Sequence, residues 1–177
     1  MSDSVQREMK PMHDPERNFI LQQGVEDPGP QDAHRRFEAL LFQPRLIGLA
    51  VLVGITLQSP AVFLSLWAVL WWSALLPHLN PFDALYNVTL GARPGAIRLR
   101  PAPAPRRFAQ GMAGTFALAI GSLLRLEWFI TAFVLEVFLG AAIAALIFGR
   151  FCLGSYIYHL LRGETDFAGK TLPWSHP

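Results

Sequence analysis

The sequence contains a single cysteine among its 177 residues. One cysteine, Cys152, excludes an intrachain disulfide and any metal site built from several cysteines. The chain also has no glycine-rich phosphate loop, no histidine pair with metal-ligand spacing, and no hydrolase, kinase or dehydrogenase motif. We therefore expect no metal and no cofactor, and we favour a non-catalytic protein over an enzyme, although missing motifs alone do not exclude an enzyme.

Charge is absent from two long stretches of the chain. Residues 46–79 contain no Asp, Glu, Lys or Arg, and residues 108–148 contain only Arg125, Glu127 and Glu136. A bilayer sorts charge in this way, whereas a soluble fold has no reason to do so. The sequence therefore predicts an all-α membrane protein with four transmembrane helices in two hairpins.

The predicted spans differ in strength. The last one, Trp128 to Phe148, has 21 residues and is interrupted only by Thr131 and Glu136; about 20 apolar residues cross the hydrocarbon core. The first span is the weakest, because its uninterrupted apolar run covers only residues 46–57. A re-entrant first hairpin that does not reach the far side is therefore an alternative.

The positive charges predict the orientation. Tight turns near residues 58–60 and 125–127 would place the N-terminal tail, the central connection and the C-terminal end on one face. Every Lys and Arg except Arg125 then lies on that face, which the positive-inside rule assigns to the cytoplasm. The start of the chain also lacks the pattern of a secretory signal. We expect both termini to be cytoplasmic.

The predicted organisation has six parts. They are a polar, disordered or extended cytoplasmic tail over residues 1–31, an interfacial amphipathic helix over 32–43, a transmembrane hairpin over 44–77, a cytoplasmic Arg/Pro-rich connection over 78–107, a second transmembrane hairpin over 108–148, and a cytoplasmic end with Cys152 over 149–177.

Local patterns support these boundaries. The tail is rich in proline and polar residues and lacks the apolar surface to fold alone. In the next segment Phe37, Leu40 and Leu41 share one helical face, and its arginines face anionic lipid headgroups. Within the connection, residues 80–87 begin with a turn signal and could form a short helix. The arginines of residues 93–107 coincide with the predicted cytoplasmic face, so we favour lipid headgroups over nucleic acid as their partners.

The two hairpins resemble a diverged duplication. A shift of 67 residues aligns Gln43 with Gln110, Leu57 with Leu124, and the two outer turns with each other. Repeats separated by an even number of spans have parallel orientations, as in one class of transporter folds.

Glu136 is the most costly residue of the chain in a membrane, because it lies in the middle of the most apolar run. It must be protonated, paired, or directed into a polar interior. Thr56, Ser65 and Thr115 are candidate hydrogen-bond partners. The residue is either a proton- or ligand-handling site or a polar contact between helices or subunits.

Small residues recur at the spacing that lets helix backbones approach closely. The pairs Gly140-xxx-Ala144 and Ala117-xxx-Gly121 are examples, and we interpret them as packing positions. Cys152 follows Arg150 at the cytoplasmic end of the last span, where a lone cysteine is usually structural or acylated.

Two segments that flank the second hairpin carry a resemblance to a known family. They are Arg106-Arg107-Phe108-Ala109-Gln110 and Phe151-Cys152-Leu153-Gly154-Ser155-Tyr156-Ile157-Tyr158. They resemble the signature of a bacterial membrane family known as domain of unknown function 4395, and the similarity extends over roughly residues 42–162. The resemblance implies a small four-helix protein of the bacterial inner membrane without an assigned activity.

The resemblance also implies a role for sulfur or thiol chemistry, because some members are similar to proteins found beside thioredoxin-like and sulfurtransferase proteins. In that family the second hairpin commonly ends in Cys-x-Gly-Cys. Here Cys152 occupies the first position and Ser155 the second. One cysteine cannot run a dithiol cycle within the chain, so a mixed disulfide, a persulfide or an acyl adduct remains.

Three functions follow as hypotheses. The first is a non-enzymatic accessory or scaffold subunit that docks a larger membrane assembly through its helices and N-terminal tail. Whatever the function, the partners expected in the bilayer are other membrane subunits or copies of the same chain in a homo-oligomer. The second is a membrane partner of cytoplasmic sulfur or thiol chemistry that acts through Cys152. The third is a small oligomeric transporter with a midplane acid at Glu136. The candidate functional residues are Glu136, Cys152, Ser155, Gln110, Arg106 and Arg107.

Overall fold

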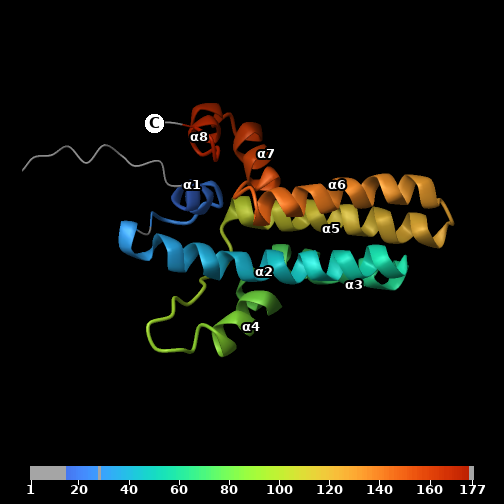
Figure 1. Ribbon diagram of the computed structural model, residues 1–177, viewed down its shortest axis with the longest axis horizontal. Helices are drawn as coiled ribbons and strands as arrows, with labels where there is room; N and C mark the ends of the chain where they lie inside the picture. The colour runs from blue at the N-terminus through green and yellow to red at the C-terminus, as the bar shows by residue number, and fades with distance from the viewer. Residues whose placement is uncertain (1–14, 28, 176–177) are drawn as a thin grey trace, which may run out of the picture.

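The computed structural model describes residues 15–27 and 29–175, which contain helices and no strands. Four long helices form a bundle: α2 (Gly29–Leu57), α3 (Pro60–Leu75), α5 (Ala104–Arg125) and α6 (Phe129–Ile147). The shorter helices gather at one end of it, as Figure 1 shows. They are α1 (Pro15–Gln22), the 3-10 turn η1 (Pro77–Leu79), α4 (Pro81–Thr89), α7 (Leu153–Leu161) and α8 (Thr165–Lys170).

The two predicted hairpins are present. The first turn lies between Leu57 and Pro60, where Gln58 adopts a left-handed φ of 46° and Ser59 caps the start of α3 by accepting from the Val62 N–H. The second turn follows Arg125. A left-handed residue after the last helical turn ends a helix, and a capped residue with proline at the first position starts the next. The turn signals in the sequence thus fix both hairpins.

The bundle has a continuous apolar core. It includes Phe63 and Leu70 of α3, Ala117 and Ile120 of α5, and Ala132 of α6. Helix α3 packs along α5, α2 packs on α6, and each hairpin packs on itself. The four helices therefore form a closed ring of neighbours.

The outer surface of the bundle is also apolar. Ile130 is 84% exposed and Phe138 is 64% exposed, both on α6, and Leu52 of α2 is 61% exposed. By length and composition, the segment Asp32–Leu57 and helix α6 could each cross a membrane, while α3 is apolar but shorter. Two of the four predicted spans thus have the dimensions of membrane helices in the part of the chain that the structure describes.

The prediction of a disordered tail over residues 1–31 is wrong for its second half. Residues 15–22 form α1, and Phe19 and Ile20 are fully buried against Phe37, Leu40 and Leu41 of α2. Phe19 and Ile20 supply enough apolar surface for this short helix to dock. The polar composition of the tail as a whole does not predict this. The first 14 residues of the tail lie outside the described residues.

Three other boundaries differ from the prediction. The interfacial segment 32–43 and the first span form one continuous helix, α2, with Pro44 inside it. Helix α5 begins at Ala104, within the proline-rich spacer, because proline fits the first turn of a helix. The C-terminal end is not a simple tail but folds into α7 and α8. The short helix expected over residues 80–87 is confirmed as α4.

Candidate functional site

Two clusters of buried polar side chains lie at the end of the bundle where α1, α4 and α7 meet it. We call the first the polar junction; it consists of Gln43, Ser73, Asn80, Asp83, Arg106 and Gln110, which are all buried. We call the second the thiol corner; it consists of Gln22, Cys152, Ser155, His159 and Glu164. Of these five, only Glu164 is not buried.

Arg106 is the centre of the polar junction. Its guanidinium lies 2.7 Å from Asp83 Oδ1 and also donates to Gln43 Oε1 at 2.7 Å. Both charged side chains are less than a tenth exposed. A buried charge must be paired to be tolerated, and this pair joins α5 to α4. Arg106 stands out in the sequence and Asp83 does not, although an arginine next to an apolar hairpin requires an acid within reach.

Asn80 extends the junction to α3. Its Oδ1 accepts from the Phe82 N–H and from Ser73 Oγ, and its Nδ2 donates to Asp83 Oδ2 at 3.1 Å. Asparagine is a favoured helix N-cap because its side-chain oxygen takes one of the free N–H groups of the first turn. The segment Asn80-Pro81-Phe82-Asp83 therefore starts α4 and also orients the acid that pairs with Arg106.

Gln110 lies one turn after Arg106 and donates to Gln43 Oε1 at 3.0 Å. Gln43 and Gln110 are the residues that the 67-residue shift aligns, so equivalent positions of the two hairpins meet inside the bundle. Arg107 is outside the junction: its Nε donates to the Ala74 carbonyl at the end of α3. The junction thus links α2, α3, α4 and α5, and its contacts are those of a structural clamp.

Cys152 occupies the N-cap position of α7 and is 3% exposed. Its backbone N–H donates to Gln22 Oε1 of α1 at 2.9 Å. Burial raises the pKa of the Cys152 thiol, while Ser155 and Gly154 at the start of α7 oppose that shift. A buried thiol with a raised pKa is a poor nucleophile, so this conformation holds Cys152 as a core residue beneath α1.

Two polar atoms near Cys152 have no hydrogen-bond partner. Ser155 Oγ and Gln22 Nε2 are both buried and unpaired. Each belongs to a residue that touches Cys152 or acts on its thiol. The family resemblance marks Ser155, which stands where the second cysteine is common. Gln22 carries no such signal, because nothing in a polar tail distinguishes one glutamine as buried.

His159 closes the thiol corner. Its Nε2 lies 3.0 Å from the Gln22 carbonyl and its Nδ1 lies 2.6 Å from Glu164 Oε2. Both partner atoms are oxygens that accept hydrogen bonds. The hydrogen bond from His159 holds the pKa of Glu164 below its ordinary value. The contact with Glu164 joins α7 to the start of α8, and the contact with the Gln22 carbonyl joins α7 to the end of α1.

Glu136 lies apart from both clusters. It is fully buried within its own bundle, and Gln58 Nε2 donates to its carboxylate at 3.1 Å. The predicted hydroxyl partners Thr56 and Thr115 donate instead to carbonyls one turn back in their own helices. Gln58 belongs to the outer turn of the first hairpin, which approaches α6 close to Glu136. The candidate residues thus divide among three separate places.

The packing positions also divide. A Cβ added at Gly121 would lie 2.9 Å from the Leu64 side chain of α3, whereas one added at Gly140 would meet nothing within 4 Å. Ala117 is fully buried and Ala144 is exposed. The small face of α5 is therefore used inside the bundle, and the small face of α6 is left open.

Among residues 15–27 and 29–175, no three His, Cys, Asp or Glu side chains are grouped so that they could hold a metal ion. A family model described as a domain of unknown function (DUF4395) matches residues 37–162. No curated protein and no solved structure matches the chain. The matched segment begins in α2 and ends directly after α7, so it includes the polar junction and most of the thiol corner.

Proposed function

Since the chain belongs to the DUF4395 family, whose function is undefined, we propose a function from its geometry: it is an integral accessory or scaffold subunit that docks a larger membrane assembly without catalysis of its own. In this proposal all four long helices cross the inner membrane of a bacterium. The turn after Arg125 lies outside, and the end with the polar junction and thiol corner lies in the cytoplasm.

The helix dimensions support four crossings. Helix α3 has 16 residues and α5 has 22, which correspond to about 24 Å and about 33 Å at 1.5 Å per residue. A short span is accommodated by local bilayer thinning, and Arg107 and Arg125 near the two ends of α5 can extend to the headgroups. The exposed apolar side chains of α2 and α6 fit the same placement.

One observation carries the docking function: the small-residue face of α6 is not used by its own bundle. Gly140 has open space where a side chain would be, and Ala141 and Ala144 beside it are exposed. Helices associate in bilayers through small residues that let backbones come close. We infer that this face of α6 is where a helix of another membrane subunit packs.

Cys152 and Glu136, the two candidates for chemistry, are buried residues that stabilise the fold. Cys152 is buried under α1 with a raised pKa, and Glu136 is enclosed and bonded to Gln58. The four helices pack in a closed ring around an apolar core. A transporter built from this chain would therefore need several copies to enclose a path for its substrate. These features favour the scaffold over the transporter.

The test is a gentle detergent extraction followed by sizing and mass spectrometry of what accompanies the chain. We expect a defined complex with larger subunits in fixed stoichiometry. The variant Gly140→Leu should lose those subunits, because its side chain blocks close approach, while keeping the fold. Ala68→Leu is the matched control, since Ala68 is an exposed small residue on α3.

Two outcomes would contradict the proposal. One is a chain that elutes alone or only with its own copies. The other is a complex that Gly140→Leu and Ala68→Leu weaken equally, because the small face of α6 would then have no special role.

A second candidate function is the thiol partner, and the unpaired Ser155 Oγ and Gln22 Nε2 beside Cys152 favour it. A sulfur adduct on Cys152 would give both groups a neighbour to bind. The two functions are separated by Cys152→Ser, which the scaffold tolerates and a thiol role does not. The measurement compares growth and complex formation of the Cys152→Ser variant with those of the parent chain.

A further inference from the structure

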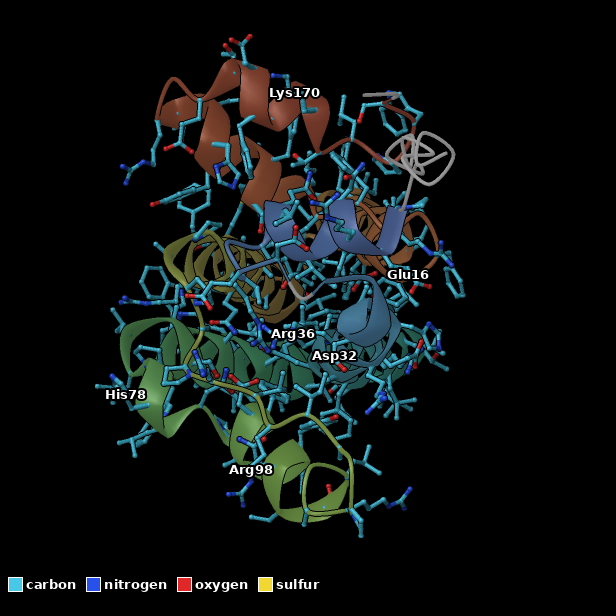
Figure 2. All side chains as sticks on the ribbon, turned by 90° about the vertical axis from the view of Figure 1, so that its left-hand side faces the viewer. Glu16, Asp32, Arg36, His78, Arg98 and Lys170 are labelled. Atoms are coloured by element: carbon cyan, nitrogen blue, oxygen red, sulfur yellow. The ribbon has the colours of Figure 1, made fainter. Side chains whose placement is uncertain are left out.

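A cavity of about 190 Å³ lies at the end of the bundle that we assign to the cytoplasm. It adjoins the polar junction, whose Arg106 is one of its lining residues, and none of its lining residues belongs to the thiol corner. The turn after α1, helix α2, the segment before α5 and the first turn of α5 surround it. Its charged lining residues are Glu26, Arg36, Arg98, Arg100 and Arg106. Figure 2 looks onto this end of the molecule, with Arg36 near the centre and Arg98 on the loop below it.

The positive charges that line this cavity exceed the negative ones. Arg106 is paired with Asp83, so it adds little net charge. Among the described residues no ion pair is found for Arg36, Arg98 or Arg100. Against these three cations stands one carboxylate, Glu26. The cavity therefore has an excess of positive charge.

Arg36 gives the most direct indication that this cavity suits an anion. Its Nε is buried and has no hydrogen-bond partner. A buried donor without an acceptor costs free energy, and a guanidinium is unusually demanding because it presents five donors in a fixed plane. An anion in the cavity would supply the acceptor.

The segment that carries Arg98 and Arg100 is fixed in place. The Asn87 side chain brackets the backbone of Leu99: its Oδ1 accepts from the Leu99 N–H at 2.8 Å, and its Nδ2 donates to the Leu99 carbonyl at 2.9 Å. Arg35 of α2 donates to the Gly95 carbonyl of the same loop. The backbone that carries the two arginines is therefore fixed to α4 through Asn87, and the loop that precedes it is fixed to α2 through Arg35.

We propose that this cavity is a binding site for a phosphate group, held by Arg36, Arg98 and Arg100. Guanidinium groups match the oxygens of phosphate in charge and geometry and bind them in pairs. A phosphomonoester or a phosphodiester is a suitable anion, because either would offset the excess charge and accept from Arg36. The phosphate belongs either to an anionic lipid headgroup at the adjacent membrane surface or to a soluble phosphate compound.

The experiment uses the full-length chain with two probes. Inorganic phosphate is titrated onto the chain in neutral detergent. The chain is also placed in bilayer discs of phosphatidylcholine with and without phosphatidylglycerol, and the lipids that stay bound on extraction are identified by mass spectrometry. The variants are Arg36→Gln and the double variant R98Q/R100Q, with Arg93→Gln as the control. Arg93 is exposed on the same loop and does not line the cavity.

We expect binding of at least one probe, weakened about tenfold or more in Arg36→Gln and in R98Q/R100Q and about twofold or less in Arg93→Gln. Selective retention of phosphatidylglycerol without binding of free phosphate identifies a lipid headgroup, and the reverse identifies a soluble ligand. The exposed pair Arg98 and Arg100 can be replaced without disturbing a core, so the test does not depend on the folding of Arg36→Gln. Binding of neither probe, or an equal loss with Arg93→Gln, would overturn the proposal.

Discussion

At the scale of single residues, the pair Arg106–Asp83 places two opposite charges in the interior of the described structure. Both charges leave water, and their attraction offsets that loss only because Gln43 and Asn80 supply further hydrogen bonds. Removing one partner of such a pair leaves the other as an uncompensated buried charge. The pair therefore makes the junction sensitive to change on either side.

We predict that Arg106→Gln lowers the free energy of unfolding by about 3–5 kcal/mol. Adding Asp83→Asn should recover part of the loss, because the isolated carboxylate is then removed. Thermal unfolding in detergent measures both variants. Arg107→Gln is the control, since Arg107 makes one bond to a backbone carbonyl and has no buried acid beside it. A double variant less stable than Arg106→Gln alone would show that the two side chains are not coupled.

At the scale of elements, α1 acts as a cover on the thiol corner. Phe19 and Ile20 are fully buried, the Phe19 ring meets the Phe37 ring edge-on at 5.2 Å, and Gln22 caps the Cys152 N–H. A helix of eight residues is too short to be stable by itself in water. Its docking thus depends on these contacts, and the exposure of Cys152 depends on its docking.

We predict that Phe19→Ala raises the labelling rate of Cys152 by a water-soluble maleimide by about tenfold or more, because loss of a buried phenylalanine costs about 3–5 kcal/mol and frees α1. Mass spectrometry over time gives the rate. Leu21→Ala, a half-buried position of the same helix, should change it far less. Rapid labelling of Cys152 in the parent chain would contradict the buried state and favour the thiol function.

The joint between α7 and α8 is predicted to be sensitive to acid. The pKa of Glu164 is lowered from its ordinary 4.5 by the hydrogen bond from His159. A carboxylate with a lowered pKa stabilises the fold above its unfolded pKa, and the contribution is lost as pH falls through the folded pKa. The midpoint of thermal unfolding should therefore drop between about pH 5 and about pH 3.

The variant Glu164→Gln isolates this effect. Its unfolding midpoint should depend less on pH over the same acidic range than that of the parent chain. Asp27 also has a lowered pKa, because Arg17 donates a hydrogen bond to its carboxylate, and this acid remains in the variant. Parallel curves for the variant and the parent would show that the His159–Glu164 pair does not contribute.

At the scale of the whole molecule, the two hairpins are arranged as the predicted duplication requires. In the predicted duplication, α2 corresponds to α5 and α3 corresponds to α6. The contact between α3 and α5 then has the contact between α6 and α2 as its counterpart, and the structure contains both contacts. Gln43 and Gln110 meet where the halves touch.

This arrangement gives a test of the four crossings. In a Cys152→Ser background, we predict that a cysteine introduced by Arg93→Cys and one introduced by Arg125→Cys react with a membrane-impermeant maleimide from opposite sides of the membrane. Both positions are exposed and lie at opposite ends of the bundle. Intact cells should label Arg125→Cys, and only opened cells should label Arg93→Cys. Labelling of both from one side would contradict four crossings.

Much of the fold follows from the sequence. The charge-free stretches, the signals at Gln58–Pro60 and Arg125–Glu127, and the cap Asn80 before Pro81 are local features, and local features decide where helices start and end. They also set which helices are joined by tight turns. Cys152 stands out as the single cysteine and Gln110 by the 67-residue alignment, whereas Arg106 and Ser155 could be chosen in advance because of the resemblance to the family.

The tertiary structure alone decided which of these residues meet. Asp83, Gln22 and His159 are ordinary polar residues by sequence, and only the packing of distant elements buries them. The same packing folds residues 15–22 of the polar tail into α1 and buries Cys152. It also brings Gln58 to Glu136 in place of the hydroxyls expected there. Packing also decides that Gly121 lies against a neighbouring helix while Gly140 does not. Contacts between helices depend on which face of each helix is turned inward. Because the small-residue faces of α5 and α6 have similar composition, the sequence does not show which of them is buried in the bundle.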